Sequence, residues 1–178
     1  DVLNFFNTWD PSMVRDGLDV FNSVKIVFPS TATEQVSKNI VGCLRSYISS
    51  WTLGGMSLED CIKPWINPLE NKISALFTDI RKSVGRLSSS LDHSSIMQLM
   101  LPWLGIFDES SLKKFVARFA IPKFVLHIRR VEPRDYVSAL KEFISYRKSM
   151  PMVHLTSVLE GEFFPRWLFV LFTLLTSN

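Results

Sequence analysis

The stretch EGEFFPRWLFVLF, residues 160–172, sets Pro165 and Arg166 into a long apolar run. Neither residue is usual inside a buried helix, because proline lacks an N–H and clashes with the preceding turn, and a buried charge is costly. Proline close before an aromatic residue recurs in KPWINPL (63–69), LMLPWLGIF (99–107) and AIPKF (120–124). The Pro-Trp pairs are 38 residues apart and the apolar-Pro-basic-aromatic strings are 43 apart. These spacings are close to one helical hairpin of a HEAT-type array, about 40–47 residues.

The hydrophobic pattern between these prolines has the period of an α-helix. One stripe at steps of three and four comprises Ile73, Leu76, Phe77, Ile80, Val84 and Leu87. A second comprises Val36, Ile40, Cys43, Leu44, Tyr47, Ile48 and Trp51. Capping patterns predict helix starts at Asp10-Pro11, Thr31, Ser57, Ser95 and Asp108. The only strand-like piece is VKIVF (24–28), which has no partner to pair with.

The sequence therefore predicts an all-α fold, a HEAT-like array of antiparallel helical hairpins (an α-solenoid) in a single domain over residues 1–178. Proline disfavours helix at the residue before it, so each proline marks either a corner between two helices or a kink in one. We interpret Pro165 as a corner with Arg166 facing solvent, and we expect Trp167→Ala to unfold or strongly destabilise the chain. The predicted core and corner residues are Pro64, Trp65, Pro102, Trp103, Pro122, Phe124, Phe164, Pro165 and Trp167.

Composition is that of a globular protein with a sizeable core: 178 residues, 47% hydrophobic, and only seven glycines. The chain starts at Asp1 without methionine, and we expect it to be part of a longer protein with no leader peptide. Its longest apolar run, Trp167–Leu175, is too short to cross a bilayer and predicts a buried helix end. Cys43 and Cys61 are far apart, which favours reduced thiols over a disulfide.

No catalytic or metal-binding pattern is visible. His93, His127 and His154 lie in separate segments, and HExxH, CxxC and GxSxG motifs are absent. Acid pairs stand at expected helix starts, where capping explains them. The sequence therefore predicts a protein that is not an enzyme and that needs no cofactor.

Positive charge is concentrated between residues 113 and 134, which hold seven basic residues and one acidic, a net charge of +6. The rest of the chain carries a net charge of −3. Three interpretations remain open: a solvated helix face, a contact with an acidic protein surface, and a contact with RNA. The candidate partner-binding residues are Lys113, Lys114, Arg118, Lys123, Arg129 and Arg130.

Four strings together resemble the GCFC domain, and within it the C-terminal half of the tuftelin-interacting protein family of G-patch splicing factors. They are KPWINPL, LMLPWLGIF, FVARFAIPKF (115–124) and MPMVHLTSVLEGEFFPRWLFVL (150–171). The resemblance covers residues 60–175. Residues 1–59 match loosely and are expected to form the N-terminal helices of the same array.

The resemblance implies a nuclear scaffold without catalysis that acts in disassembly of the intron-lariat spliceosome. Its implied partners are spliceosomal proteins, another GCFC-family or disassembly-complex subunit, and a DEAH-box RNA helicase engaged through a G-patch outside this chain. RNA contact is possible and a membrane is not expected. The family's DNA-binding label finds no support in a helix-turn-helix, zinc or long basic-region signature. The alternatives are an RNA-binding helical module built on residues 113–134 and a HEAT-type scaffold outside splicing.

Overall fold

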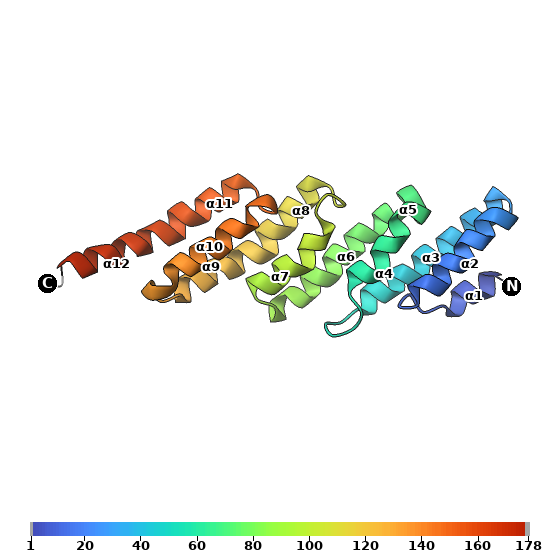
Figure 1. Ribbon diagram of the computed structural model, residues 1–178, viewed down its shortest axis with the longest axis horizontal. Helices are drawn as coiled ribbons and strands as arrows, with labels where there is room; N and C mark the ends of the chain where they lie inside the picture. The colour runs from blue at the N-terminus through green and yellow to red at the C-terminus, as the bar shows by residue number, and fades with distance from the viewer. Residues whose placement is uncertain (1, 177–178) are drawn as a thin grey trace. The chain divides into compact units, whose positions relative to one another are not determined.

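The computed structural model describes residues 2–176, and every regular element among them is helical (Figure 1). The chain divides between Leu87 and Ser88 into two compact units, here unit 1 and unit 2. The expected all-α class is confirmed. VKIVF is not a strand, because Val24–Val27 complete the second helix. Among the described residues, no helix is both long and apolar enough to cross a membrane.

Unit 1 is organised around its longest helix. Its elements are α1 (Val2–Thr8), α2 (Val14–Val27), α3 (Ser30–Ser50), α4 (Leu58–Ile62), α5 (Ile66–Leu69) and α6 (Ser74–Leu87). Helix α3 packs against α1, α2 and α6. Both predicted stripes are largely buried there, Ile40, Leu44 and Ile48 on α3 facing Leu76 and Ile80 of α6.

Buried aromatic rings of Trp9, Phe21 and Trp65 form a cluster in the core of unit 1. The ring of Trp65 meets the edge of Trp9, with centroids 5.3 Å apart, and Phe21 lies 6.0 Å from it. Gly17 of α2 sits against these rings: a β-carbon there would lie 2.6 Å from Cζ2 of Trp9 and 3.0 Å from Cζ2 of Trp65. Glycine at this position therefore lets α2 approach the two indoles closely.

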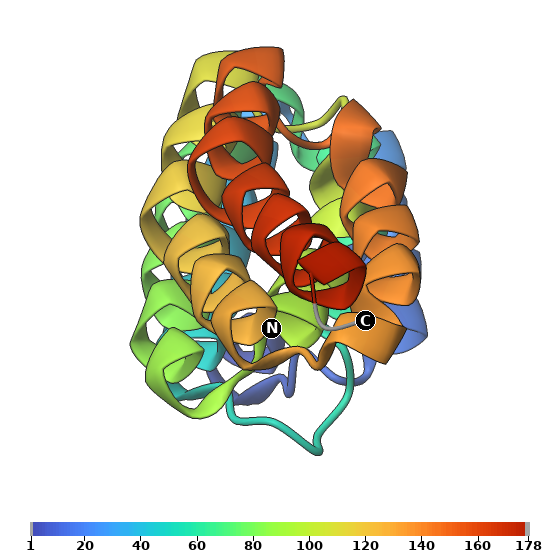
Figure 2. The same cartoon turned by 90° about the vertical axis from the view of Figure 1, so that its left-hand side faces the viewer.

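Unit 2 contains two long helical runs. Its elements are α7 (His93–Met100), α8 (Glu109–Phe115), α9 (Ile121–Arg130), α10 (Tyr136–Ser145), α11 (Met152–Val158) and α12 (Phe164–Thr176). A π-helical turn, Val116–Ala120, joins α8 to α9, and another, Leu159–Phe163, joins α11 to α12. Figure 2 looks at unit 2 from its C-terminal end, with the α8–α9 run on one side, α10 on the other and α12 between them.

Local capping explains several of the helix starts. Ser57 accepts a hydrogen bond from the N–H of Asp60, and Asp108 accepts one from the N–H of Ser111, as the sequence predicts.

The other predicted helix starts differ from the structure. Helix α7 is capped by Asp92 rather than by Ser95. Helix α3 follows Pro29 without a side-chain cap. Asp10 forms a turn, bonding the N–H of Ser12, so the predicted helix start at Asp10-Pro11 is wrong.

The four proline sites fall into two kinds. Pro64 and Pro102 stand in short 3₁₀ turns at the ends of α4 and α7. Trp65 and Trp103 are 0% and 1% exposed, which confirms both tryptophans as core residues. Phe124 is likewise buried, stacked on Phe143 at 4.1 Å.

Pro122 and Pro165 are not corners, because each lies inside a continuous helical run just after a π turn. The N–H of Ile121 bonds the oxygen of Val116, and that of Phe164 bonds Leu159, both five residues back. The wide turn removes the α-helical register in which a proline ring would clash with the carbonyl four residues earlier.

The C-terminal helix corrects a further expectation. Phe164 and Trp167 are 42% and 44% exposed, and Pro165 is exposed as well, so these three are not core residues. The buried aromatic of the motif is Phe163, one residue earlier. No residue of α12 is buried, and the predicted buried helix end is therefore wrong.

Three basic side chains, of Arg86, Lys123 and Arg166, make the same kind of contact. Each donates hydrogen bonds to main-chain oxygens at or just after the end of an earlier helix. Arg86 donates to the oxygens of Ser49 and Trp51, at 2.8 and 3.0 Å. Lys123 donates in the same way to Ser89 and Leu91, at 3.0 and 2.6 Å.

Arg166 repeats this contact with the oxygen of Arg129, at 2.8 Å, and is half-buried, so it faces solvent only in part. Ser49, Ser89 and Arg129 are spaced by 40 residues along the chain. The recurrence supports the predicted period of about 40 residues. The HEAT-like array and the single domain stay predictions.

Candidate functional site

The predicted basic segment forms the outer side of the α8–α9 run in unit 2. Exposed residues recur there at every fourth position, 114, 118, 122, 126 and 130. In a regular α-helix, each residue four positions further along is rotated by about 40° around the helix axis. After four such steps the exposed residues would no longer lie on one face of the helix. The π turn Val116–Ala120 offsets this drift by accommodating an extra residue. Lys114, Arg118 and Arg130 therefore share one continuous exposed face, here called the basic stripe.

The other three predicted residues are held by contacts within unit 2. Lys113 pairs with Glu109 on the same helix. Lys123 is committed to the oxygens of Ser89 and Leu91. Arg129 pairs through two nitrogens with Glu162. Lys123 and Arg129 thus link separate segments of unit 2, whereas the Lys113 pair lies within α8, and none of the three belongs to the basic stripe.

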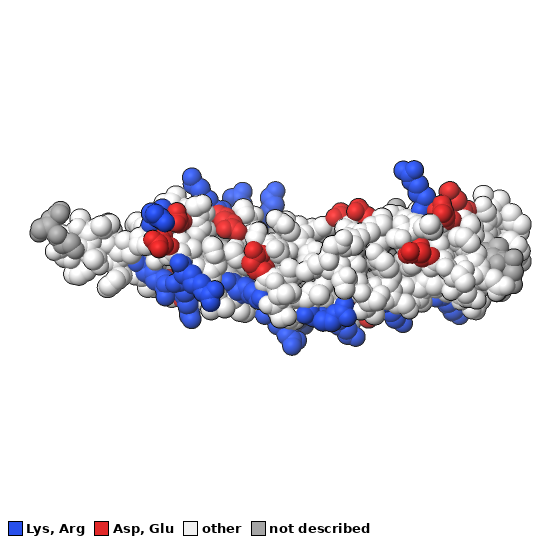
Figure 3. Space-filling view, turned by 90° about the horizontal axis from the view of Figure 1, so that it is seen from below, with Lys and Arg blue, Asp and Glu red and all other residues white. Residues whose placement is uncertain are grey.

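The members of the basic stripe form no ion pair with the described part of the chain. Arg118 lies over the ring of Phe119, with its guanidinium carbon 5.2 Å from the ring centroid. Figure 3 shows lysine and arginine gathered along one edge of unit 2, on the side that α8 and α9 form. The stripe can therefore present its charge to an acidic protein surface or to phosphates.

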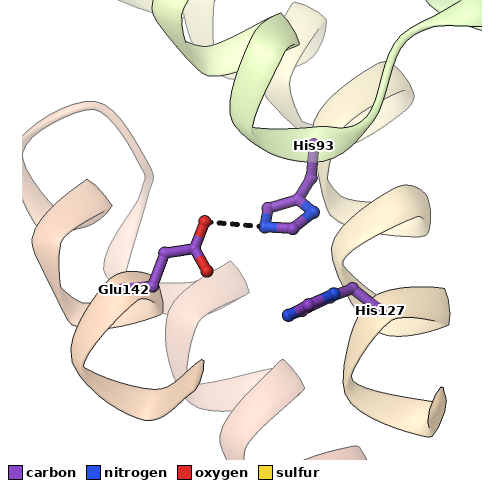
Figure 4. Close-up of side chains that lie close together, drawn as sticks. All are labelled: His93, His127 and Glu142. Carbon is purple, nitrogen blue, oxygen red and sulfur yellow. Dashed lines mark hydrogen bonds and ion pairs between the residues drawn. The ribbon is translucent and has the colours of Figure 1, made fainter. Parts of the chain in front are cut away.

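A second feature, which the sequence does not reveal, is a cluster of His93, His127 and Glu142 (Figure 4). These residues come from α7, α9 and α10 and are 34 and 15 positions apart in the chain. His93 Nε2 lies 3.0 Å from Glu142 Oε1, and the two imidazole centroids are 4.6 Å apart. Three histidines in separate segments gave no signal, because only the packing of three helices brings two of them together.

The cluster is anchored by its neighbours. His93 is 6% exposed and its ring meets the ring of Phe124 at 4.9 Å. Tyr146 donates a hydrogen bond to Glu142 Oε1 over 3.1 Å. Burial, together with the nearby His93, lowers the pKa of His127 below its usual value. A lowered pKa favours the neutral imidazole near pH 7.

Two shallow pockets open beside the cluster, and His127, Arg130 and Glu142 line both of them. The pocket on the α7 side also includes Asp92 and Lys123. The arrangement offers imidazole nitrogens and carboxyl oxygens to whatever enters these pockets, next to one end of the basic stripe.

Comparison with known proteins agrees with the family expected from the sequence. The family model described as GC-rich sequence DNA-binding factor-like protein (GCFC) matches residues 2–171, so the match also includes the N-terminal helices that the sequence motifs left out. Tuftelin-interacting protein 11 from Homo sapiens, Oryctolagus cuniculus and Canis lupus familiaris is 22% identical over 188 residues. The alignment covers 99% of this chain, which spans about a fifth (22%) of the length of each relative. The chain belongs to the GCFC family.

Proposed function

We propose that this chain is a non-catalytic helical scaffold of a nuclear pre-mRNA splicing factor that acts in disassembly of the intron-lariat spliceosome. In this proposal the basic stripe of unit 2 contacts an acidic surface of a spliceosomal protein. A G-patch segment outside residues 1–178 engages a DEAH-box RNA helicase, and the scaffold anchors that segment to the complex.

Family membership is the observation that carries the proposal, since the match extends over residues 2–171 and includes both units. The relatives of the tuftelin-interacting protein group align over almost the whole chain. The recurrence of main-chain contacts at a spacing of 40 residues supports a repeat scaffold, an architecture that provides extended binding surfaces.

The choice of surface rests on which cations are available. Lys123 and Arg129 already bond groups of unit 2, whereas Lys114, Arg118 and Arg130 are exposed on one helix face. A protein partner is favoured over RNA, because no aromatic ring beside the stripe is free for a base to stack on. Phe115 and Phe124 are buried. Phe119 is half-buried, and its ring already contacts Arg118 and Phe115.

The test is a pulldown of nuclear-extract proteins by the immobilised chain, with bound proteins identified by mass spectrometry. The wild-type chain is expected to retain intron-lariat spliceosome proteins. A triple reversal, Lys114→Glu, Arg118→Glu and Arg130→Glu, should lose them. A charge-matched control reverses exposed cations of unit 1, Arg15→Glu, Lys38→Glu and Lys82→Glu, and should retain them. Equal retention by both triple variants, or no spliceosomal protein with wild type, would contradict the proposal.

A parallel measurement separates a protein contact from an RNA contact. Binding to single-stranded RNA is titrated with salt, where losing three phosphate contacts would flatten the slope of log K against log salt by about 2. The proposal expects no such change in slope and unchanged retention after nuclease treatment of the extract. A steep, stripe-dependent slope would assign the stripe to RNA instead.

A further inference from the structure

We propose that His93, His127 and Glu142 form a binding site for a divalent transition-metal ion, with zinc as the physiological ion. The site lies beside Arg130 at one end of the basic stripe, but its three ligands are not stripe residues and it does not depend on the function proposed above. It would join α7, α9 and α10 of unit 2 through one ion.

The ligand set is the first argument. Two imidazoles and one carboxyl group are a combination that zinc accepts, and three protein ligands leave a fourth position for water. Such a water has access here, because His127 and Glu142 line both pockets beside the cluster. Mg²⁺ and Ca²⁺ prefer oxygen ligands and are disfavoured by the two nitrogens.

The distances are the second argument. The three ligand atoms all lie within 4.8 Å of one another, and the His93–Glu142 edge is 3.0 Å. Tetrahedral ligands at about 2.0–2.1 Å from zinc stand roughly 3.3 Å apart. The two edges that involve His127 are at most 4.8 Å. His127 is half-buried and lines the pocket on the α7 side, so we infer that its side chain turns to close these edges when an ion binds.

The surroundings are the third argument. Phe124 and Tyr146 already hold His93 and Glu142 in place, so two of the ligands are positioned before an ion arrives. The pocket's positive groups, Lys123 and Arg130, are matched by Asp92 and Glu142. Lys123 also points its ammonium at the oxygens of Ser89 and Leu91, which reduces its repulsion of a cation in the cluster.

The test measures binding of zinc and of Co²⁺ to the purified, chelator-treated chain by calorimetry and by visible absorption of the cobalt form. We expect one ion per chain. An ion that binds only the folded protein at about a hundred times its Kd should raise Tm by about 5–10 °C, and EDTA should reverse the rise. X-ray absorption of the zinc form should show two imidazoles and one carboxyl group.

Matched variants assign the ion to the cluster. His127→Gln and Glu142→Gln should each weaken binding by about 10–100-fold, whereas His154→Gln, on α11 and outside the cluster, should bind like wild type. His93 is left unchanged, because it is buried and packs against Phe124. Unaltered binding in both cluster variants, absence of a one-to-one complex, or an absorption spectrum lacking imidazole ligands would overturn the proposal. The X-ray measurement uses wild type alone and decides even where a variant misfolds.

Discussion

Arg166 donates a hydrogen bond from Nη1 to the main-chain oxygen of Arg129, which ties the beginning of α12 to the end of α9. Carbonyl oxygens at a helix C-terminus lack partners within the helix, so a nearby guanidinium or ammonium satisfies them and also interacts favourably with the helix dipole. Arg86 does the same at the end of α3, and Lys123 does it at Ser89 and Leu91.

Removing such a contact should destabilise the unit that contains it. Arg86→Met is expected to cost about 1–2 kcal/mol, because it deletes two charged hydrogen bonds, an exposed one to Ser49 and a partly buried one to Trp51. Tm should fall by roughly 2–4 °C per kcal/mol in a calorimetric melt. Arg15→Met, at an exposed position of α2, is the control and should melt with wild type. Equal melting of the two variants would show that the Arg86 contact adds no stability.

Two glycines inside helices should respond oppositely to alanine. Alanine normally stabilises a helix interior by about 1 kcal/mol relative to glycine. Gly42→Ala on α3 should show this gain, since no atom lies within 4 Å of the added carbon. Gly17→Ala should instead destabilise by about 1–3 kcal/mol, because the added carbon meets the rings of Trp9 and Trp65. Urea unfolding measures both, and a stabilising Gly17→Ala would mean that the indoles move aside.

Two tryptophans that follow prolines should differ in their contribution to stability. Trp103→Ala removes a ring that is 1% exposed and stacked on Phe107, and should cost about 3–5 kcal/mol. Trp167→Ala removes a ring that is 44% exposed, and the cost should stay below about 2 kcal/mol. Chemical denaturation of both variants tests this difference. The sequence alone predicts that Trp167→Ala unfolds or strongly destabilises the chain. Similar costs for the two variants would support that earlier expectation and contradict the smaller cost predicted here.

Acid should weaken the link between α9 and the second π turn. Arg129, and next to it Arg166, hold the pKa of Glu162 below its usual value. A carboxyl group with a lowered folded pKa adds stability above its unfolded pKa of about 4.3, and this addition disappears as the pH falls through the folded value. Glu162→Gln should therefore lower Tm at pH 7, and its difference from wild type should shrink as the pH falls from about 4.3 through the lower folded pKa. A difference that persists at low pH would assign the effect to packing.

The sequence predicted much of the fold, because local signals decide it. The stripes of α3 and α6 follow the helical period, and Ser57 and Asp108 cap helices where expected. Trp65 and Trp103 are buried beside their prolines as predicted. Each of these features depends on residues within a few positions of one another.

The failures share a dependence on distant contacts. Proline in an apolar run indicates a break, but not whether a corner or a π turn accommodates it, as at Pro122 and Pro165. Trp167 looks like a core residue until the surroundings of α12 are known. His93 and His127 approach only through the packing of α7 on α9, which no spacing in the chain encodes.

The π turn before Pro122 also has a consequence for how this chain can change in length. A wide turn accommodates one surplus residue, so deleting a residue from Val116–Ala120 should restore a regular α-helix while α8 and α9 keep their present neighbours. The regular helix would, however, set the Pro122 ring against the carbonyl four residues before it. Deleting a residue from the π turn should thus be tolerated when Pro122 is also replaced, and poorly tolerated when Pro122 is kept. The same coupling is expected between the π turn Leu159–Phe163 and Pro165.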